Sequence, residues 1–273
     1  MVKIFLMRHG ESISNELKGK IQNACSDRKI STGQEDDKLE EIKCSDDPNI
    51  LNSKLSQTGI KQCIKARKKL KRWKNIKHVV ISPLRRVFET LEYLFEEYPS
   101  FINKDLKIHI MPDLREMLCS ASDLACWTDN EVNSLRYPKY YDWEFLNQTA
   151  SDPFFWFLDQ LSKKEQERCK QMFVDIIPKD GDEFIVKRDK LLKTFSDHYS
   201  KDYKIESQET CHDRVNRAKL RIIKILEDYN VQDKELIVIS HASILGHLTS
   251  TEKTKQFVPK KYTSFYEGDI KKY

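Results

Sequence analysis

Arginine, histidine and glutamate side chains follow directly after four short apolar runs of this sequence. The runs are "KIFLM" from Lys3, "HVVI" from His78, "KIHIM" from Lys107 and "LIVIS" from Leu236. The polar side chains that follow them are Arg8, His9, Glu11, Ser82, Arg85, Arg86, Arg115, Glu116 and His241.

This combination of residue types suits the transfer of a phosphoryl group. Arginine forks match the charged oxygens of phosphate with paired hydrogen bonds. A neutral imidazole in line with phosphorus can attack it, which gives a phosphohistidine that water later hydrolyses. Gly10 would let the backbone approach the phosphate closely, and a helix starting soon after it would add N–H donors. We therefore expect Arg8 to hold a phosphate that His9 attacks.

The elements needed to bring these side chains together are strands that alternate with helices. The four apolar runs are rich in Val and Ile, as is typical of buried strands. Between them lie stretches with residues at helical spacing. One stripe comprises Ile60, Cys63, Ile64, Arg67, Leu70 and Trp73, and a second runs from Val87 to Tyr98. This alternation predicts an α/β fold, a three-layer sandwich around a mostly parallel sheet. Ligands bind at the carboxyl ends of such strands, so the polar side chains are expected to converge on one crevice.

The length of 273 residues and the 39% hydrophobic content fit a single domain over residues 1–273 that carries an insertion. The insertion is expected at about residues 118–208 and to form a helical cap. Its aromatic cluster of Tyr137, Tyr140, Tyr141 and Trp143 is expected to attach the insertion to the core rather than to contact substrate. Residues 16–52 read as a loop, and neither this loop nor the insertion contains a motif that names a substrate.

Charge and composition exclude several classes of partner. The net charge of +5 comes without a block of like charge, so a nucleic-acid partner is not expected. No apolar stretch is long enough for a signal peptide or a membrane span, which predicts a soluble cytoplasmic protein with no membrane partner. The seven cysteines include no CxxC pair, so neither a zinc site nor a disulfide framework is indicated, and no metal or other cofactor is expected.

Taken in order along the chain, these motifs resemble the histidine phosphatase superfamily, which includes cofactor-dependent phosphoglycerate mutases and many phosphatases. The matching segments are "RHGES" from Arg8, Asn15, "LSQTG" from Leu55, "SPLRR" from Ser82 with Thr90, "LRE" ending at Glu116 and "ISH" ending at His241.

The resemblance implies a role for each matching residue. His9 would be the phospho-acceptor, and Arg8, Asn15, Arg86 and His241 would bind the phosphate. Arg86 is preferred to Arg85 because the family's arginine lies four positions before a threonine, here Thr90. Glu116 would protonate the leaving oxygen and then activate water.

The same resemblance implies that Glu209 and Arg217 belong to a supporting helix motif. One departure is Ala242 after the second histidine, where the family often has glycine.

Three functions are compatible with these residues. Glycolytic mutases continue after the glutamate with Arg-His-Tyr-Gly, whereas here Met117, Leu118 and Cys119 follow. This favours a phosphatase that hydrolyses phosphate monoesters of small metabolites. Mutase-type phosphoryl transfer is the alternative, and a phosphate-binding module or scaffold without turnover is a third. The sequence does not indicate the oligomeric state.

Overall fold

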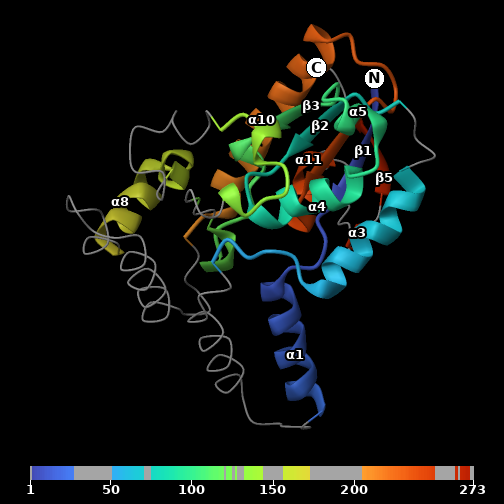
Figure 1. Cartoon of the computed structure of the whole chain (residues 1–273). Coiled ribbons are helices and arrows are strands. Elements are labelled where there is room, and N and C mark those ends of the chain that lie inside the picture. Colours follow the sequence, from blue (N-terminus) through green and yellow to red (C-terminus); the bar gives the residue numbers. More distant parts are fainter. Residues whose placement is uncertain are drawn as a thin grey trace.

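A mixed β-sheet forms the centre of the computed structural model, which describes residues 2–27, 51–70, 75–119, 121–124, 127, 132–143, 156–172, 205–249, 262–263 and 265–270 (Figure 1). Within these residues the strand order is β3-β2-β4-β1-β5. Neighbouring strands are parallel except for β5, which runs antiparallel to β1. The expected α/β class and mostly parallel sheet are therefore confirmed. The strands are β1 (Val2–Arg8), β2 (His78–Ile81), β3 (Lys107–Ile110), β4 (Leu236–Ser240) and β5 (Phe265–Ile270).

The central strands are buried on both faces. Every residue of β2 and β4 is buried, which explains why these segments read as continuous apolar runs rather than as alternating ones. The sequence analysis did not anticipate β5. Its sequence "FYEGDI" contains a glycine and two acidic residues, which are depleted in strands, and it lies at the edge of the sheet.

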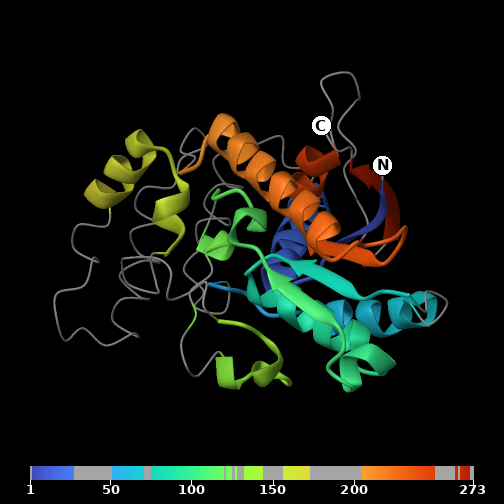
Figure 2. The ribbon, with the colours of Figure 1, turned by 90° about the horizontal axis from the view of Figure 1, so that it is seen from above.

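Helices cover both faces of the sheet, as the three-layer expectation requires (Figure 2). One apolar cluster joins Ile237 and Ile239 of β4 to α3 (Gln57–Leu70) and α4 (Arg85–Phe95). A second cluster joins Leu236 and Val238 to α10 (Gln208–Asp228) and α11 (Ala242–Thr249). Alternate residues of one strand thus face opposite helical layers.

The expected apolar stripe on α4 is confirmed, because Val87, Leu91 and Phe95 are fully buried. The stripe expected on α3 is partly wrong. Its residues Cys63, Arg67 and Leu70 are buried, as expected, whereas Ile64 is 45% exposed. The other buried residues of this helix are Gly59 and Ala66. Trp73 lies outside the described residues.

The interpretation of residues 16–52 as a loop is wrong in its first part. Helix α1 (Ile13–Asp27) begins three residues after Gly10 and continues through this region. The expected helix after Gly10 is therefore present. Residues 28–50 lie outside the described residues.

The described parts of the insertion are short helical segments. They are η2 (Ala121–Asp123), η3 (Pro138–Tyr140), η4 (Trp156–Gln160) and α8 (Lys163–Met172), which stands to one side of the sheet in Figure 1. The expectation that the aromatic residues anchor the insertion is confirmed. The ring of Phe88 on α4 stacks on Trp143 at 5.2 Å between centroids and meets Tyr141 edge-on at 4.7 Å. The description of the insertion as a cap, and of the chain as one domain, stays a prediction.

Two further short elements flank β3, namely α5 (Pro99–Ile102) before it and η1 (Pro112–Leu114) after it. Among the helices that the structure describes, none combines the length and the apolar character needed to cross a membrane.

Candidate active site

The ends of β1 and β4 place the two predicted histidines side by side. The strands are parallel neighbours in which Arg8 pairs with Ser240, so the next residues along each chain are His9 and His241. The backbone N–H of His9 donates to the carbonyl of Ser240 at 3.0 Å. The two imidazole rings lie 5.0 Å apart between centroids. The convergence expected from strand ends is therefore present for both residues.

The ring of His9 is held as a neutral imidazole in which one nitrogen carries no hydrogen. Its Nδ1 lies 2.6 Å from the carbonyl oxygen of Gly10. A carbonyl can only accept, so Nδ1 carries the hydrogen and Nε2 keeps its lone pair. Burial lowers the pKa of His9 well below its usual value, and the positive charges of Arg86 and Arg8 lower it further. His9 can therefore present Nε2 as a nucleophile at neutral pH.

The guanidinium of Arg86 points toward the lone pair of His9 Nε2. Arg86 lies in the first turn of α4, is almost fully buried, and its Nε donates to His9 Nε2 at 3.3 Å. Thr90, one turn later, accepts from the Gly10 N–H at 2.9 Å and donates to the Arg86 carbonyl at 2.6 Å. This pair of hydrogen bonds ties the start of α4 to the residue after His9, which gives a physical reason for a threonine four positions after the arginine.

Arg8 is oriented by an aromatic ring that the sequence analysis missed. The guanidinium carbon of Arg8 lies 3.9 Å from the ring centroid of Tyr262, which is within the range of a cation–π interaction. The ring of Tyr262 is also 6.0 Å from the ring of His9. Tyr262 belongs to no motif, because its position depends on β5 returning along β1.

Gly10 has a packing role in addition to the expected one, and its close approach to a phosphate stays a prediction. A Cβ at this position would lie 2.9 Å from the sulfur of Cys63 and 3.0 Å from the carbonyl oxygen of Gly59. The glycine is therefore needed for close packing against α3, rather than only for the approach of a phosphate.

Asn15 lies in the first turn of α1 and lines the cavity described below. Its side-chain oxygen accepts from the hydroxyl of Ser12 at 2.8 Å. The amide nitrogen is then the atom of Asn15 that is able to donate to a bound anion. This placement agrees with the predicted role of Asn15.

Glu116 enters the same cavity from the segment after β3. Its Oε1 accepts from the N–H of Met117 at 3.0 Å and from the hydroxyl of Ser243 in the first turn of α11. Its Oε2 lies 3.8 Å from His241 Nδ1. Because Oε1 already accepts twice, a proton on this carboxyl belongs on Oε2. Burial raises the pKa of Glu116, and the negative charge of Asp123 raises it further, which favours the protonated form that a general acid needs.

His241 is fully buried and is not among the residues that line the cavity. Its Nε2 lies 2.8 Å from the hydroxyl of Ser82, and its Nδ1 lies 3.4 Å from Arg86 Nη2. A guanidinium can only donate, so Nδ1 accepts from Arg86 and Nε2–H donates to Ser82. Direct binding of phosphate by His241 stays a prediction, since its contacts with the site run through Arg86 and Glu116.

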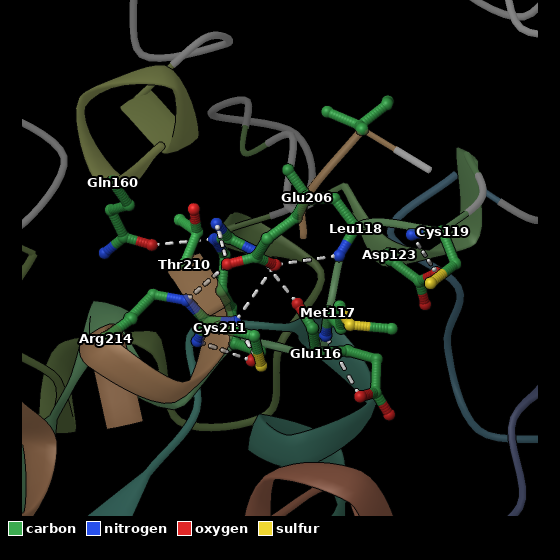
Figure 3. A network of polar contacts seen from close by, with 12 residues as sticks. Glu116, Met117, Leu118, Cys119, Asp123, Gln160, Glu206, Thr210, Cys211 and Arg214 are labelled. Atoms are coloured by element: carbon green, nitrogen blue, oxygen red, sulfur yellow. Dashed lines mark hydrogen bonds and ion pairs between the residues drawn. The ribbon is translucent and has the colours of Figure 1, made fainter. Parts of the chain in front are cut away.

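The segment that carries Glu116 is anchored by a buried ionic triad (Figure 3). The carboxylate of Glu206 accepts from Arg115 at 2.8 and 3.2 Å and from Arg214 at 2.9 and 3.2 Å. It also accepts from the backbone N–H of Leu118 at 3.0 Å. Arg214 in turn donates to the backbone carbonyls of Asp113 and Arg115 at 2.5 and 2.9 Å. Both ends of the segment are therefore held by the same three charges.

Two sequence-based expectations are corrected by this triad. Arg115 does not reach the crevice, because consecutive residues of an extended chain point to opposite sides, and here Glu116 takes the cavity side. The supporting pair is Glu206 and Arg214 rather than Glu209 and Arg217. Glu209 is exposed, and Arg217 instead pairs with Asp113 at 3.2 Å.

The cavity that these residues share has a volume of about 510 Å³, within the range of small-molecule sites. It extends past Arg8, His9 and Arg86 toward polar side chains of α1, α10 and α11, and toward the insertion. Among them, His247, Lys18 and Asp123 belong to none of the sequence motifs. The lining residues are Arg8, His9, Ser14, Asn15, Lys18, Arg86, Glu116, Met117, Cys119, Ser122, Asp123, Gln208, Ala242, Ser243 and His247.

A cluster of three or more metal-ligating side chains is not found among the residues that the structure describes. Positive charge is brought to this cavity by Arg8, Arg86 and Lys18.

Comparison with protein families matches residues 49–186 to the histidine phosphatase superfamily, branch 1. The chain belongs to this superfamily. The matched region contains Arg86, Glu116 and part of the insertion, while Arg8, His9 and His241 lie outside it. A search of curated proteins returned no match.

Several solved structures are similar to the chain. One is an Escherichia coli K-12 protein described as an α-ribazole-5′-phosphate phosphatase, with 15% identity, 91% of this chain and 78% of that chain covered, and a TM-score of 0.41. Another is phosphoserine phosphatase from Entamoeba histolytica, with 15% identity, 90% and 77% covered, and a TM-score of 0.38. A third is the ecdysone phosphate phosphatase from Bombix mori, with 14% identity, 98% and 88% covered, and a TM-score of 0.45. These similarities do not assign a substrate to this chain.

Proposed function

We propose that the protein is a phosphatase that hydrolyses phosphate monoesters of small metabolites through a phosphohistidine on His9. The observation that carries this proposal is the orientation of the His9 ring. Its Nδ1–H is held by the Gly10 carbonyl, so the lone pair of Nε2 faces Arg86. A phosphoryl group bound to that guanidinium would lie next to the nucleophile.

The proposed reaction has two steps. His9 Nε2 attacks phosphorus while Arg8 and Arg86 bind the peripheral oxygens, and Glu116 gives its proton to the leaving alkoxide. Water then attacks the phosphohistidine, and Glu116, now ionised, accepts a proton from that water. The neutral His9 is regenerated and inorganic phosphate leaves.

The size of the cavity supports a small organic leaving group. Beyond the phosphate-binding side chains it continues to Lys18 on α1, Gln208 on α10 and His247 on α11. These side chains offer hydrogen bonds and a positive charge to a polar substrate. Met117 and Cys119 lie where a glycolytic mutase has part of its Arg-His-Tyr-Gly segment, which supports hydrolysis over mutase-type transfer.

A panel of phosphorylated sugars, nucleotides, glycerates and phosphopeptides tests the proposal by release of inorganic phosphate. Release that is lost in His9→Ala is the expected result. Isomerisation of phosphoglycerates that far exceeds phosphate release would favour a mutase. Binding of phosphate esters without any turnover would favour the scaffold function.

A further inference from the structure

The carboxylate of Asp123 lies inside the phosphate site although the residue belongs to the insertion. Asp123 ends η2, is 8% exposed, and lines the same cavity as His9 and Arg86. Its Oδ1 lies 3.5 Å from Arg86 Nη2, and its Oδ2 accepts from the Cys119 N–H at 3.4 Å. An acidic group at this place is unexpected, because the same guanidinium should bind an anionic substrate.

Arg86 is held both by the two histidines and by the insertion. Its Nε and Nη2 donate to the imidazoles of His9 and His241 at 3.3 and 3.4 Å. From the insertion, the carbonyl of Ser122 accepts from Nη1 at 2.7 Å, and Asp123 Oδ1 pairs with Nη2 at 3.5 Å. The insertion therefore shares in fixing this guanidinium beside His9.

Asp123 also influences the pKa of Glu116, the other carboxyl group that lines the cavity. The charged and polar groups around Glu116 come from five parts of the chain. Burial raises the pKa of Glu116, the charge of Asp123 raises it further, and Ser243, Arg86 and the Met117 N–H oppose the increase. The groups that face Glu116 are Asp123 from the insertion, Arg86 from α4, His241 after β4, Ser243 from α11 and the N–H of Met117.

We propose that Asp123 is an internal counter-ion of the phosphate site, which holds the Arg86 guanidinium beside His9 and opposes the binding of phosphate there. Asp123 is thus a positioning residue and not a catalytic one. Because its carboxylate remains close to the phosphate, it also favours release of the product. The kinetic part of this proposal rests on the proposed function, whereas the binding part concerns only the site.

The binding part is tested by titrating the full-length protein with inorganic phosphate at pH 7 in a calorimeter. Asp123→Asn should bind phosphate more tightly, by about tenfold, which is the scale on which a neighbouring like charge changes an ionisation equilibrium. The smaller neutral variant Asp123→Ser should change the affinity in the same direction, so one poorly folded variant does not leave the question open. Asp159→Asn removes the same charge from an exposed position of the insertion and should leave phosphate binding unchanged.

The sign of the effect separates this proposal from a purely structural role. If Asp123 only held the insertion in place, its removal would loosen Arg86 and weaken phosphate binding. Unchanged or weaker binding in both neutral variants would overturn the proposal. Tighter binding in a protein that hydrolyses no phosphate ester would support it and would reject the proposed function instead.

A pH profile provides the second measurement. In Asp123→Asn the rate of an alkyl phosphate should begin to fall at a lower pH than in the unmodified protein, because Glu116 then loses its proton more easily. An aryl ester needs no proton on its leaving group, so its burst rate should show no such change. A profile with the same basic limb in both proteins would contradict the link between Asp123 and Glu116.

Discussion

Replacing Glu206 by glutamine tests whether the buried triad holds the segment that carries Glu116. The substitution keeps the shape of the side chain but removes the only negative charge of the triad. Arg115 and Arg214 would then be two buried guanidinium groups without their counter-ion. Removing one partner of a buried ionic network is strongly destabilising because it leaves uncompensated charge behind.

The expected loss of stability follows from the pKa of Glu206. Burial opposes ionisation of this carboxyl, yet the charges of Arg115 and Arg214 lower its pKa from 4.5 to about 2. A decrease of this size corresponds to about 3 kcal/mol of stabilisation of the folded protein at pH 7. The folded-state pKa is depressed, so this stabilisation is present above the unfolded pKa and is lost as the pH falls toward the folded pKa. By pH 3 roughly half of it should be gone.

Urea unfolding at pH 7 and at pH 3 measures this prediction. Glu206→Gln should lower the free energy of unfolding by about 3 kcal/mol at pH 7, and by about half as much at pH 3. Glu167→Gln is the matched control, because Glu167 pairs with Lys170 on the exposed surface of α8. Its effect should stay below about 0.5 kcal/mol at both pH values.

A functional measurement accompanies the unfolding experiment. Where the variant is folded, hydrolysis of an alkyl phosphate should fall more than that of an aryl ester, because Glu116 has lost the anchor of its backbone. The reasoning is refuted if Glu206→Gln costs less than about 1 kcal/mol, or if its effect is the same at pH 7 and pH 3.

Four further predictions concern the site. Glu116→Gln should slow phosphoryl transfer from an alkyl phosphate by about 100-fold and from p-nitrophenyl phosphate much less, as measured in the pre-steady-state burst; equal losses would exclude Glu116 as the acid. Because the pKa of Glu116 is raised, the alkyl reaction should persist above the usual carboxyl range and decline as the pH rises through that raised pKa. Tyr262→Leu should raise KM roughly fivefold through loss of the ring beside Arg8, while Tyr262→Phe should change it little; equal effects of the two variants would assign no role to the ring. Metal chelators should leave the rate unchanged, and strong inhibition would show that the mechanism uses a metal.

The parts of the site that lie at strand ends could be predicted from the sequence. His9 and His241 follow continuous apolar runs, and parallel strands end at the same edge of the sheet, so their proximity needed no further information. Helical layers were also predictable, because the apolar stripe on α4 is long and regular.

The side chains that surround these residues could not be predicted in the same way. Ser243 donates a hydrogen bond to Glu116, which lies 127 positions earlier in the sequence. Asp123, in the insertion, pairs with Arg86. Neither residue belongs to a motif, because a short hydroxyl or carboxyl side chain acquires its role only from long-range packing. The prediction for Arg115 is wrong because the direction of its side chain depends on the backbone conformation after η1. The residue types next to Arg115 do not reveal that conformation.

One measurement tests the central claim most directly, which is that His9 Nε2 forms a covalent bond to phosphorus. The protein is mixed with a ³²P-labelled substrate, quenched within milliseconds, and the labelled residue is identified. The account predicts label on His9 that is stable to alkali and labile to acid, and no label in His9→Ala. Label on a serine, or turnover without any labelled protein when phosphoryl transfer is faster than hydrolysis, would contradict it.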